Sequence, residues 1–419
     1  MSEILQKYRY LSRYLPPADR RTIVMLTGAR QTGKTTLSKA FYPQLRYVNL
    51  DAPENREAVR RIHSTDWARD IGPALLDEAQ KEPVVFDKVK FSYDTGELSF
   101  CVLLGSSQIL LLKRIRETLA GRVSIYELWP LMMSELLWDQ SAANASPPLV
   151  DALFSEASCD TIFSDLPRTL LPEEDAPLQR AEAHLLQWGG MPSLLPLPPD
   201  ARKKWLKDYG YTYLERDVAD LARIDDLMPF RKFQRLAALR SGGLLNYSEL
   251  ARDTGISVDT ARRYLEYLRI SYQNILLPPY HVNLTSTVVK SPKLYWLDIG
   301  LMRQLSGIHE TVTGEIYETM VVGEMIKWMK TTGKEAELYF YRTRSGREVD
   351  LLLETFSGII GIEIKSRKVV APKDTTALKE IASALGSRWR GGLIMYPGDT
   401  LGQIASPSIW AVPSRRLFS

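Results

Sequence analysis

Short apolar runs alternate with longer, helix-compatible segments along the first third of the chain. Strands that are buried on both faces of a sheet read as continuous apolar runs, and helices between them make neighbouring strands run parallel. The pattern therefore predicts a parallel β-sheet with helices on both faces. Residues 1–20 are expected to form a short basic helix ahead of it. The expected strands are residues 23–26, 45–51, 73–78, 100–105 and 123–128.

The loop after the first expected strand matches G-x-x-x-x-G-K-[ST] at every fixed position. Its glycines let backbone N–H groups approach a phosphate, and the next helix adds its positive N-terminal end. Lys34 would reach the β- and γ-phosphates, and the Thr35 hydroxyl would bind Mg²⁺. The alternative is a glycine-containing turn that matches by chance. The residues expected to bind ATP are Gly28, Ala29, Arg30, Gln31, Thr32, Gly33, Lys34, Thr35 and Thr36.

Two adjacent carboxylates end the third expected strand. Asp77 can hold Mg²⁺ opposite Thr35, and Glu78 can polarise a water for attack on the γ-phosphate. A small-molecule kinase does not need the second acid, because its acceptor is a substrate oxygen rather than water. The pair therefore favours hydrolysis. An acidic pair at a strand end is also common surface chemistry, but here it follows a phosphate-binding loop.

Two further polar residues are candidates for the same site. Ser107 follows the fourth expected strand, where a polar group could position the attacking water. Arg122 precedes the fifth strand and could stabilise transition-state charge in its own or a neighbouring subunit. The simpler alternatives are a polar turn for Ser107 and a helix-end arginine that caps backbone carbonyls for Arg122.

Residues 244–268 have the pattern of a helix–turn–helix unit. Ser248 is the expected cap of the first helix, and Gly255 supplies the tight turn. The second helix offers Arg262 and Arg263 for contacts with phosphates or bases of DNA. Two apolar runs that follow could form the wing of a winged helix. Units of this kind also serve as spacers between proteins, so both interpretations stay open.

A second set of charged residues lies near the C-terminus. Two apolar strands flank a turn at residues 355–358, and a symmetric hairpin places Asp350 directly opposite Glu363. Two carboxylates that face each other at about 5 Å are unfavourable without a cation between them. Alternation along the strand puts Lys365 on the same face as Glu363. Glu324, on a preceding helix, is expected to join this set.

Acids and a lysine on one face are the layout of a Mg²⁺-dependent phosphodiesterase. The acids Glu324, Asp350 and Glu363 would hold the metal, and Lys365 would orient or activate water. One alternative is an ordinary hairpin whose charged residues face solvent. Another is a nuclease-like fold that binds nucleic acid but does not cut it.

Composition narrows the class of protein further. The chain has 419 residues, which is long for one core and predicts two or three domains. A net charge of +4 permits contact with nucleic acid without arguing for it. Two cysteines and four scattered histidines speak against a disulfide framework and a zinc site. The chain lacks an apolar stretch of about 18 residues and a signal-peptide core, so a cytoplasmic protein without membrane contact is expected.

Four stretches resemble the prokaryotic AAA-type ATPases that carry a C-terminal domain of unknown function. The resemblance implies ATP hydrolysis by an AAA core, with Asp77 and Glu78 as its Walker-B acids. It further implies that Ser107 is the first sensor and Arg122 a candidate arginine finger. Because such modules usually complete their active sites between subunits, a homo-oligomer is also implied. The stretches are Gly28–Thr35, Leu76–Gln80, Leu104–Ser107, and Leu119–Arg122 with Leu128 and Pro130.

The C-terminal set resembles the restriction-endonuclease superfamily of D…E-x-K nucleases, on Asp350, Glu363 and Lys365. This resemblance implies a mixed sheet flanked by helices, and DNA as a partner. Residues 189–192 and 213–218 also resemble the AAA-type family, which extends that resemblance across most of the chain.

These observations predict an α/β protein in four parts. The leading hypothesis is an ATP-binding and ATP-hydrolysing AAA-type ATPase coupled to a DNA-binding, nuclease-like C-terminal domain whose ability to cut stays open. The alternative is a nucleotide-dependent switch or scaffold that binds a protein and has an inactive nuclease-like fold. The parts are a P-loop AAA-type ATPase core (1–140), a linker and helical segment (141–230), a winged-helix-like domain (231–310) and a nuclease-like domain (311–419).

Overall fold

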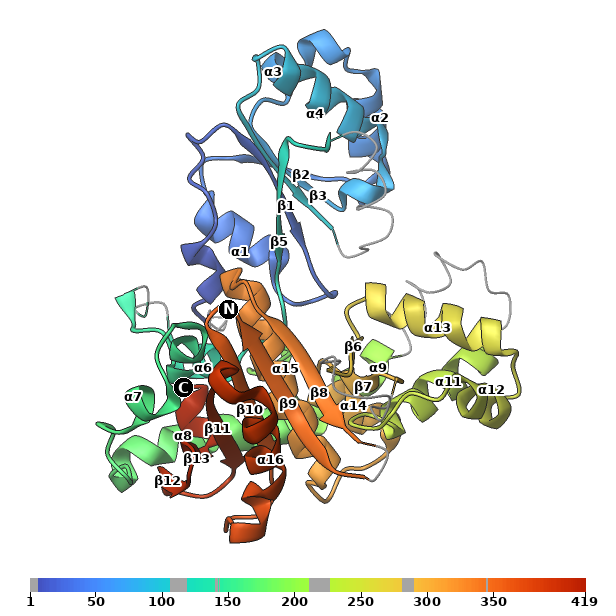
Figure 1. Cartoon of the computed structure of the whole chain (residues 1–419). Coiled ribbons are helices and arrows are strands. Elements are labelled where there is room, and N and C mark those ends of the chain that lie inside the picture. The colour runs from blue at the N-terminus through green and yellow to red at the C-terminus, as the bar shows by residue number, and fades with distance from the viewer. Residues whose placement is uncertain are drawn as a thin grey trace. The chain divides into compact units, whose positions relative to one another are not determined.

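The computed structural model describes residues 7–105, 119–139, 142, 144–210, 227–280, 290–343 and 346–419 (Figure 1). The chain divides into two compact units, each of which is described by itself. The N-terminal unit comprises Arg9–Pro130 together with Tyr267–Tyr272. The larger unit comprises Met1–Tyr8, Leu131–Glu266 and Gln273–Ser419. Ser107 and residues 213–218 lie outside the described residues.

The N-terminal unit is built on a five-stranded sheet in the order β2-β3-β4-β1-β5. Every pair of neighbouring strands is parallel, which confirms the predicted parallel sheet. Each strand lies within one residue of an expected apolar run or inside it. The strands are β1 (Thr22–Thr27), β2 (Arg46–Asn49), β3 (Ala74–Asp77), β4 (Phe100–Leu104) and β5 (Val123–Glu127). The helices are α1 (Lys34–Phe41), α2 (Pro53–Arg61), α3 (Trp67–Asp70) and α4 (Val84–Asp94).

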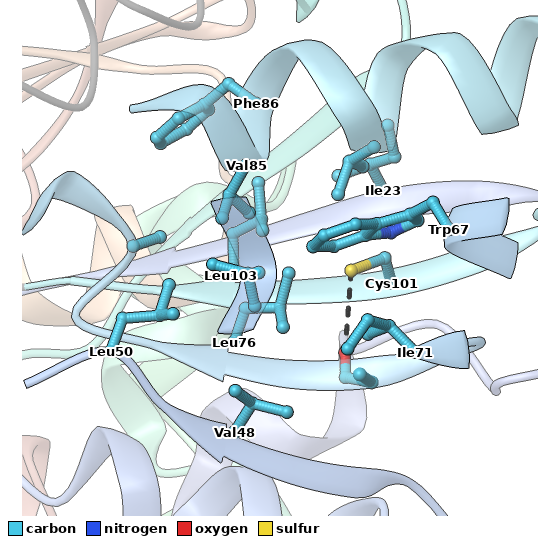
Figure 2. Close-up of a cluster of buried hydrophobic side chains, with 14 of the residues drawn as sticks. Ile23, Val48, Leu50, Trp67, Ile71, Leu76, Val85, Phe86, Cys101 and Leu103 are labelled. Carbon is cyan, nitrogen blue, oxygen red and sulfur yellow. Dashed lines mark hydrogen bonds between the residues drawn. The ribbon is translucent and has the colours of Figure 1, made fainter. Parts of the chain in front are cut away.

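Hydrophobic clusters cover both faces of this sheet. On one face, Ile23 and Met25 pack with side chains of α2, α3 and α4, among them Trp67 (Figure 2). On the other face, Val24 and Leu26 pack with α1 and with the segment that precedes β1. The alternation follows because successive side chains of a strand point to opposite faces. Helices on both faces are therefore confirmed.

Both cysteines are buried thiols. In the core of the N-terminal unit, the Cys101 thiol donates a hydrogen bond to the Ala74 carbonyl at 3.5 Å (Figure 2). Burial raises the pKa of Cys101 and of Cys159 to about 12. Thiols that stay protonated are poor metal ligands and poor nucleophiles. The two cysteines are thus core residues in the structure.

Helices dominate the first part of the larger unit. The last turn of α13 belongs to the N-terminal unit, so this helix is shared between the two units. The helices are α6 (Met133–Leu137), α7 (Cys159–Phe163), α8 (Pro172–Trp188), α9 (Pro199–Tyr209), α11 (Met228–Leu239), α12 (Tyr247–Thr254), α13 (Val258–Ile270), α14 (Ile299–Ser306) and α15 (Gly314–Thr332).

The predicted helix–turn–helix pattern is formed by α12 and α13. Gly255 sits between them with φ 81°, a left-handed conformation that favours glycine. The expected cap was wrong by two residues: the Asn246 side chain accepts from the N–H groups of Ser248 at 3.1 Å and Glu249 at 3.2 Å. An antiparallel pair follows, β6 (Asn274–Leu277) with β7 (Lys293–Trp296).

The C-terminal part of the larger unit is a six-stranded mixed sheet in the order β12-β13-β11-β10-β9-β8. The hairpin of β9 and β10 is antiparallel, while β10, β11 and β13 are parallel. Helix α16 (Thr376–Leu385) packs its apolar side on this sheet, and α17 (Ser414–Leu417) ends the fold. The strands are β8 (Glu337–Arg342), β9 (Glu348–Thr355), β10 (Gly358–Ile364), β11 (Trp389–Tyr396), β12 (Gly402–Ala405) and β13 (Ile409–Pro413).

A pair of glycines joins three elements of the larger unit. The N–H of Gly190 donates to Asp298 Oδ2 at 2.8 Å, and Asp298 Oδ1 caps α14 by accepting from Leu301 at 3.0 Å. A Cβ on Gly189 would lie 2.3 Å from Asp298 Oδ1, and one on Gly190 would lie 2.3 Å from the Leu131 carbonyl oxygen. No side chain fits at these distances, so the glycine pair is explained by packing.

Candidate functional site

The phosphate-binding loop lies between the carboxyl end of β1 and the first residue of α1. Gly28 has φ 143°, and a Cβ there would lie 2.2 Å from the Leu128 carbonyl oxygen. Gly33 has φ 96° and precedes the first residue of α1, Lys34. The loop therefore needs glycine at both positions, as the motif requires. The Lys34 ammonium folds back over the loop and donates to the carbonyls of Gly28 at 2.9 Å and Ala29 at 2.8 Å.

Thr35 and Asp77 meet at this end of the sheet, although 42 residues separate them in sequence. The Thr35 hydroxyl donates to Asp77 Oδ2 at 2.7 Å. The Tyr47 hydroxyl donates to the same oxygen at 2.9 Å, and the N–H of Glu78 donates to Asp77 Oδ1 at 3.0 Å. Burial, and then Asp77, raise the pKa of Tyr47, so its hydroxyl stays a donor. A hydroxyl and a carboxylate so close together fit the hard-oxygen preference of Mg²⁺.

Glu78 has an uncommon backbone conformation, with φ 54°. Residues other than glycine adopt this left-handed region rarely, and such residues cluster at functional sites. Its carboxylate accepts a hydrogen bond from the Gln80 side-chain amide. Gln80 belongs to a stretch that resembles the AAA-type family, but the sequence alone indicates no role for it. The structure assigns it a contact that orients Glu78.

Arg122 lies at the opposite end of the sheet from the phosphate loop. The parallel register pairs Ile23 with Val123, so Arg122 stands beside the amino end of β1, whereas Gly28 follows its carboxyl end. A strand of this length spans roughly 20 Å. The Arg122 guanidinium is bound to the carboxylate of Asp94 at 2.5 Å and 3.0 Å. A role for Arg122 in its own subunit's site is therefore wrong, because parallel strands separate the two ends.

Arg9 contacts the loop and was missed by the sequence analysis. Its guanidinium, which is buried, donates to the carbonyls of Thr32 at 2.6 Å and Trp129 at 2.5 Å. It thus connects the phosphate loop to the segment after β5. The described part of residues 1–20 contains a short 3-10 helix at Tyr10–Arg13 in place of the expected longer helix. Sequence spacing offered no signal for this contact.

Tyr272 is a second residue that the sequence analysis missed. Its hydroxyl lies 2.6 Å from the Thr27 hydroxyl, next to Gly28, and 3.3 Å from Glu127 Oε1. Its ring packs edge-on against Trp129 at 5.2 Å. With φ 59° it is another left-handed residue. Tyr272 follows α13 in the chain and belongs to the N-terminal unit, where it contacts the strand ends that carry the phosphate loop.

The larger unit holds an acidic pocket of about 570 Å³, defined here by Lys293, Glu318, Glu348, Asp350, Glu363 and Lys365. The hairpin ladder pairs Ile362 with Leu351, in the register predicted from the symmetric turn. The next positions, Asp350 and Glu363, lie at the end of that ladder. Three predicted residues, Asp350, Glu363 and Lys365, are therefore brought together.

Glu324 does not join this pocket. One of its carboxylate oxygens accepts from the Met133 N–H at 2.7 Å, and the other pairs with Lys327. Helix α15 instead places Glu318, six residues earlier, in the pocket, and Glu315 of the same helix also lies on the lining. Six residues turn a helix by about 240°, so the side chains of Glu318 and Glu324 leave from different faces. The prediction chose the correct helix but the wrong residue.

Buried acids in the pocket hold their protons more tightly than usual. Burial and the neighbouring Asp350 raise the pKa of Glu318 to about 7 and that of Glu363 to about 8. Burial also raises the pKa of Asp350. Burial works against the Lys293 ammonium, but Glu318, Asp350 and Glu348 outweigh it and raise the pKa of Lys293.

The pocket does not fit the predicted Mg²⁺ site. Asp350 Oδ2 accepts from the Ile364 N–H at 2.7 Å, and Glu363 Oε1 is paired with Lys365. The Lys293 ammonium pairs with Glu318, Glu348 and Asp350. Among the described residues, no group of three or more acid, histidine or cysteine side chains is arranged to hold a metal ion. The side chains of the pocket therefore do not fit a bound metal ion.

Comparison with known proteins agrees with the geometry of the N-terminal unit. Residues 20–137 match a family model described as an AAA domain. The chain carries a P-loop ATPase domain of the AAA type. Residues 180–312 match a domain of unknown function (DUF8612), and residues 313–417 match another (DUF4143). No helix in the described part of the chain is long and apolar enough to span a bilayer.

Similar full-length proteins carry no functional name. The Mycobacterium tuberculosis protein Rv2008c is 26% identical over 411 residues, covering 96% of this chain and 82% of its own length. The Methanocaldococcus jannaschii protein MJ1544 is 24% identical over 351 residues, covering 79% and 72%. Both are called uncharacterized. Among solved structures, a Walker-type ATPase of Pyrococcus abyssi is 15% identical, with a TM-score of 0.43, covering 70% of this chain and 94% of that one.

The contact of Arg9 with the phosphate loop can be tested by substitution. We expect Arg9→Met to weaken ATP binding roughly tenfold, because two buried carbonyls lose their donor at a cost of about 1–2 kcal/mol. Titration of a fluorescent ATP analogue measures the effect. Arg13→Met is the matched control, since the Arg13 guanidinium lies over the Tyr10 ring, at 4.6 Å. Equal affinities of the two variants would contradict the role of Arg9.

Proposed function

We propose that this protein binds and hydrolyses ATP in its N-terminal unit and uses the nucleotide to control a DNA-binding larger unit. The observation that carries the first part is the hydrogen bond between Thr35 and Asp77 at the mouth of the phosphate loop. Lys34 would leave the loop carbonyls for the β- and γ-phosphates, assisted by the N-terminal end of α1. Bound Mg²⁺, held by Thr35 and Asp77, would neutralise charge on the phosphates.

Glu78 supplies the hydrolytic step in this proposal. Its carboxylate, oriented by Gln80, would accept a proton from the attacking water. Tyr47 would keep Asp77 in place through the hydrogen bond to Oδ2. Ser107 remains a predicted sensor of the γ-phosphate. The presence of a second acid after Asp77 favours hydrolysis over phosphoryl transfer to a small molecule.

Two variants should distinguish ATP binding from ATP hydrolysis. We expect Lys34→Ala to lose ATP binding, because the charge that faces the phosphates is gone. Glu78→Gln should keep binding but lose hydrolysis by about 10²–10⁴-fold, the usual contribution of a general base. Nucleotide titration and phosphate release measure the two steps. Hydrolysis by Glu78→Gln at the wild-type rate would refute the proposed base.

We propose that the active site is completed between subunits of a homo-oligomer. Arg122 lies too far from its own phosphate loop to act there, but its side chain is partly exposed, which allows contact with a neighbouring subunit. Arg122→Ala and Glu78→Gln should each be inactive alone. Mixed together, they should recover a measurable fraction of wild-type hydrolysis, because some interfaces then combine an intact Glu78 with an intact Arg122.

The control for this mixing experiment is Asp94→Ala, which removes the partner of Arg122 but keeps the arginine. It should hydrolyse ATP close to the wild-type rate. Mixtures that stay inactive, or a protein that remains monomeric with ATP on size-exclusion chromatography, would argue against completion in trans.

For the larger unit, we propose that α12, α13 and the β6–β7 pair form a winged helix that contacts DNA. Arg263 on α13 is exposed. The Arg262 guanidinium lies 4.5 Å from the centre of the Tyr247 ring, and this cation–π contact favours an extended Arg262 side chain. Second helices of such units enter the major groove. The two helices α12 and α13 and the turn between them support this proposal. The nuclease-like domain would add to DNA binding without a metal.

Salt dependence distinguishes DNA binding from the runner-up, a switch that binds a protein partner. Replacing Arg262 and Arg263 by Gln should weaken DNA binding roughly tenfold and reduce its salt dependence, because phosphate contacts are lost. Fluorescence anisotropy with duplex DNA at several salt concentrations measures both. Arg252→Gln, which changes an arginine paired with Asp253 on α12, is the control. Wild type without salt-sensitive DNA affinity would favour the protein-binding alternative.

A further inference from the structure

We propose that Lys293 is the resident cation of the acidic pocket: its ammonium group takes the place that a divalent metal would hold among the acids. The acids of the pocket are then balanced largely by protein cations, and the pocket acquires affinity for a divalent cation only when this lysine is removed. This inference concerns the larger unit alone and does not rest on ATP hydrolysis or DNA binding.

The position of Lys293 is fixed by the backbone. It lies in β7, where it pairs with Leu277 of β6 and also bridges to Leu244. Its side chain is 3% exposed. The ammonium group reaches three acids from this place: Glu318 Oε1 at 2.8 Å, Glu348 Oε1, and Asp350 Oδ1 at 3.9 Å. A buried ammonium held by the ladder and by three carboxylates cannot move aside without leaving charge unpaired.

The three acids come from two separate elements and converge on this one cation. Glu318 is on α15, while Glu348 and Asp350 are on β9. Carboxylate oxygens are also the ligands that a divalent cation prefers, although as arranged here around the lysine they form no metal site. Here the tip of a lysine meets them, and the Phe340 ring lies 5.6 Å from it. The acids are therefore assembled around a protein cation.

The other charged side chains of the pocket are also paired, so its carboxylates would gain little from binding a metal. Glu348 Oε2 pairs with Arg342 at 3.1 Å, and Glu363 pairs with Lys365. Four carboxylates thus face three cations inside the pocket. Arg240 and Glu315 add one charge of each sign to its lining. A divalent cation placed beside the Lys293 ammonium would meet repulsion from it, with most carboxylate oxygens already engaged.

A purely structural ion pair would have a different consequence from a resident cation. If Lys293 only stabilised the fold, removing it would lower stability without creating any metal affinity. If it stands in for a metal, its removal exposes acids that a divalent cation can bind and restabilise. Metal binding, measured without any enzymatic reaction, therefore separates the two interpretations.

The test uses full-length protein with Asp77→Ala, so that the phosphate-loop site takes no metal, and without nucleotide. Mn²⁺ is the probe, followed by calorimetry and by the metal-dependent shift in melting temperature. Before any change to Lys293, we expect no Mn²⁺ binding that depends on Asp350. Lys293→Met should bind Mn²⁺ at least about tenfold more tightly and melt at a higher temperature with it. Adding Asp350→Asn should abolish this gain.

Lys290→Met is the matched control, because Lys290 is exposed and lies three residues earlier. It should leave Mn²⁺ binding unchanged. A folded Lys293→Met protein without gained binding would overturn the proposal. If Lys293→Met does not fold, the parent protein still decides: Mn²⁺ binding that Asp350→Asn removes would refute a resident cation, and its absence would support one. Folding rescued by adding Glu318→Gln to Lys293→Met would further support charge neutralisation.

Discussion

Parallel pairing of β1, β4 and β3 is the constraint on which the candidate ATPase site depends. Because parallel strands end at the same edge of a sheet, the loop after β1 and the acids after β3 must meet there. The hydrogen bond from Thr35 to Asp77 is the direct result. The same rule carries Arg122 to the far edge, since it precedes its strand instead of following it. The parallel arrangement of the strands thus brings the residues of the candidate ATPase site together and keeps Arg122 away from them.

The phosphate loop is supported from outside the motif. Arg9 holds the Thr32 carbonyl, and Tyr272 meets Thr27 just before Gly28. The two residues come from segments that precede β1 and follow α13, so this support does not come from the motif itself.

In the acidic pocket, acids with the spacing of a nuclease motif are paired with protein cations. The hairpin brings Asp350 and Glu363 together, where two buried carboxylates need a cation. In this chain the cation is a lysine from another strand, Lys293. Burial then raises the pKa of Glu363 and Glu318, which lowers the negative charge further. The pocket therefore satisfies its electrostatics with protein groups.

Local and periodic features were determined by the sequence itself. Apolar runs gave the five parallel strands, the glycine motif gave the phosphate loop, and the symmetric turn gave the register of the hairpin. Each depends on residues close in sequence, whose spacing determines direction and face. The contacts of Arg9, Tyr272 and Lys293, and the choice of Glu318 over Glu324, were decided only by tertiary structure. They join residues far apart in the chain, where no spacing rule indicates which side chains will meet.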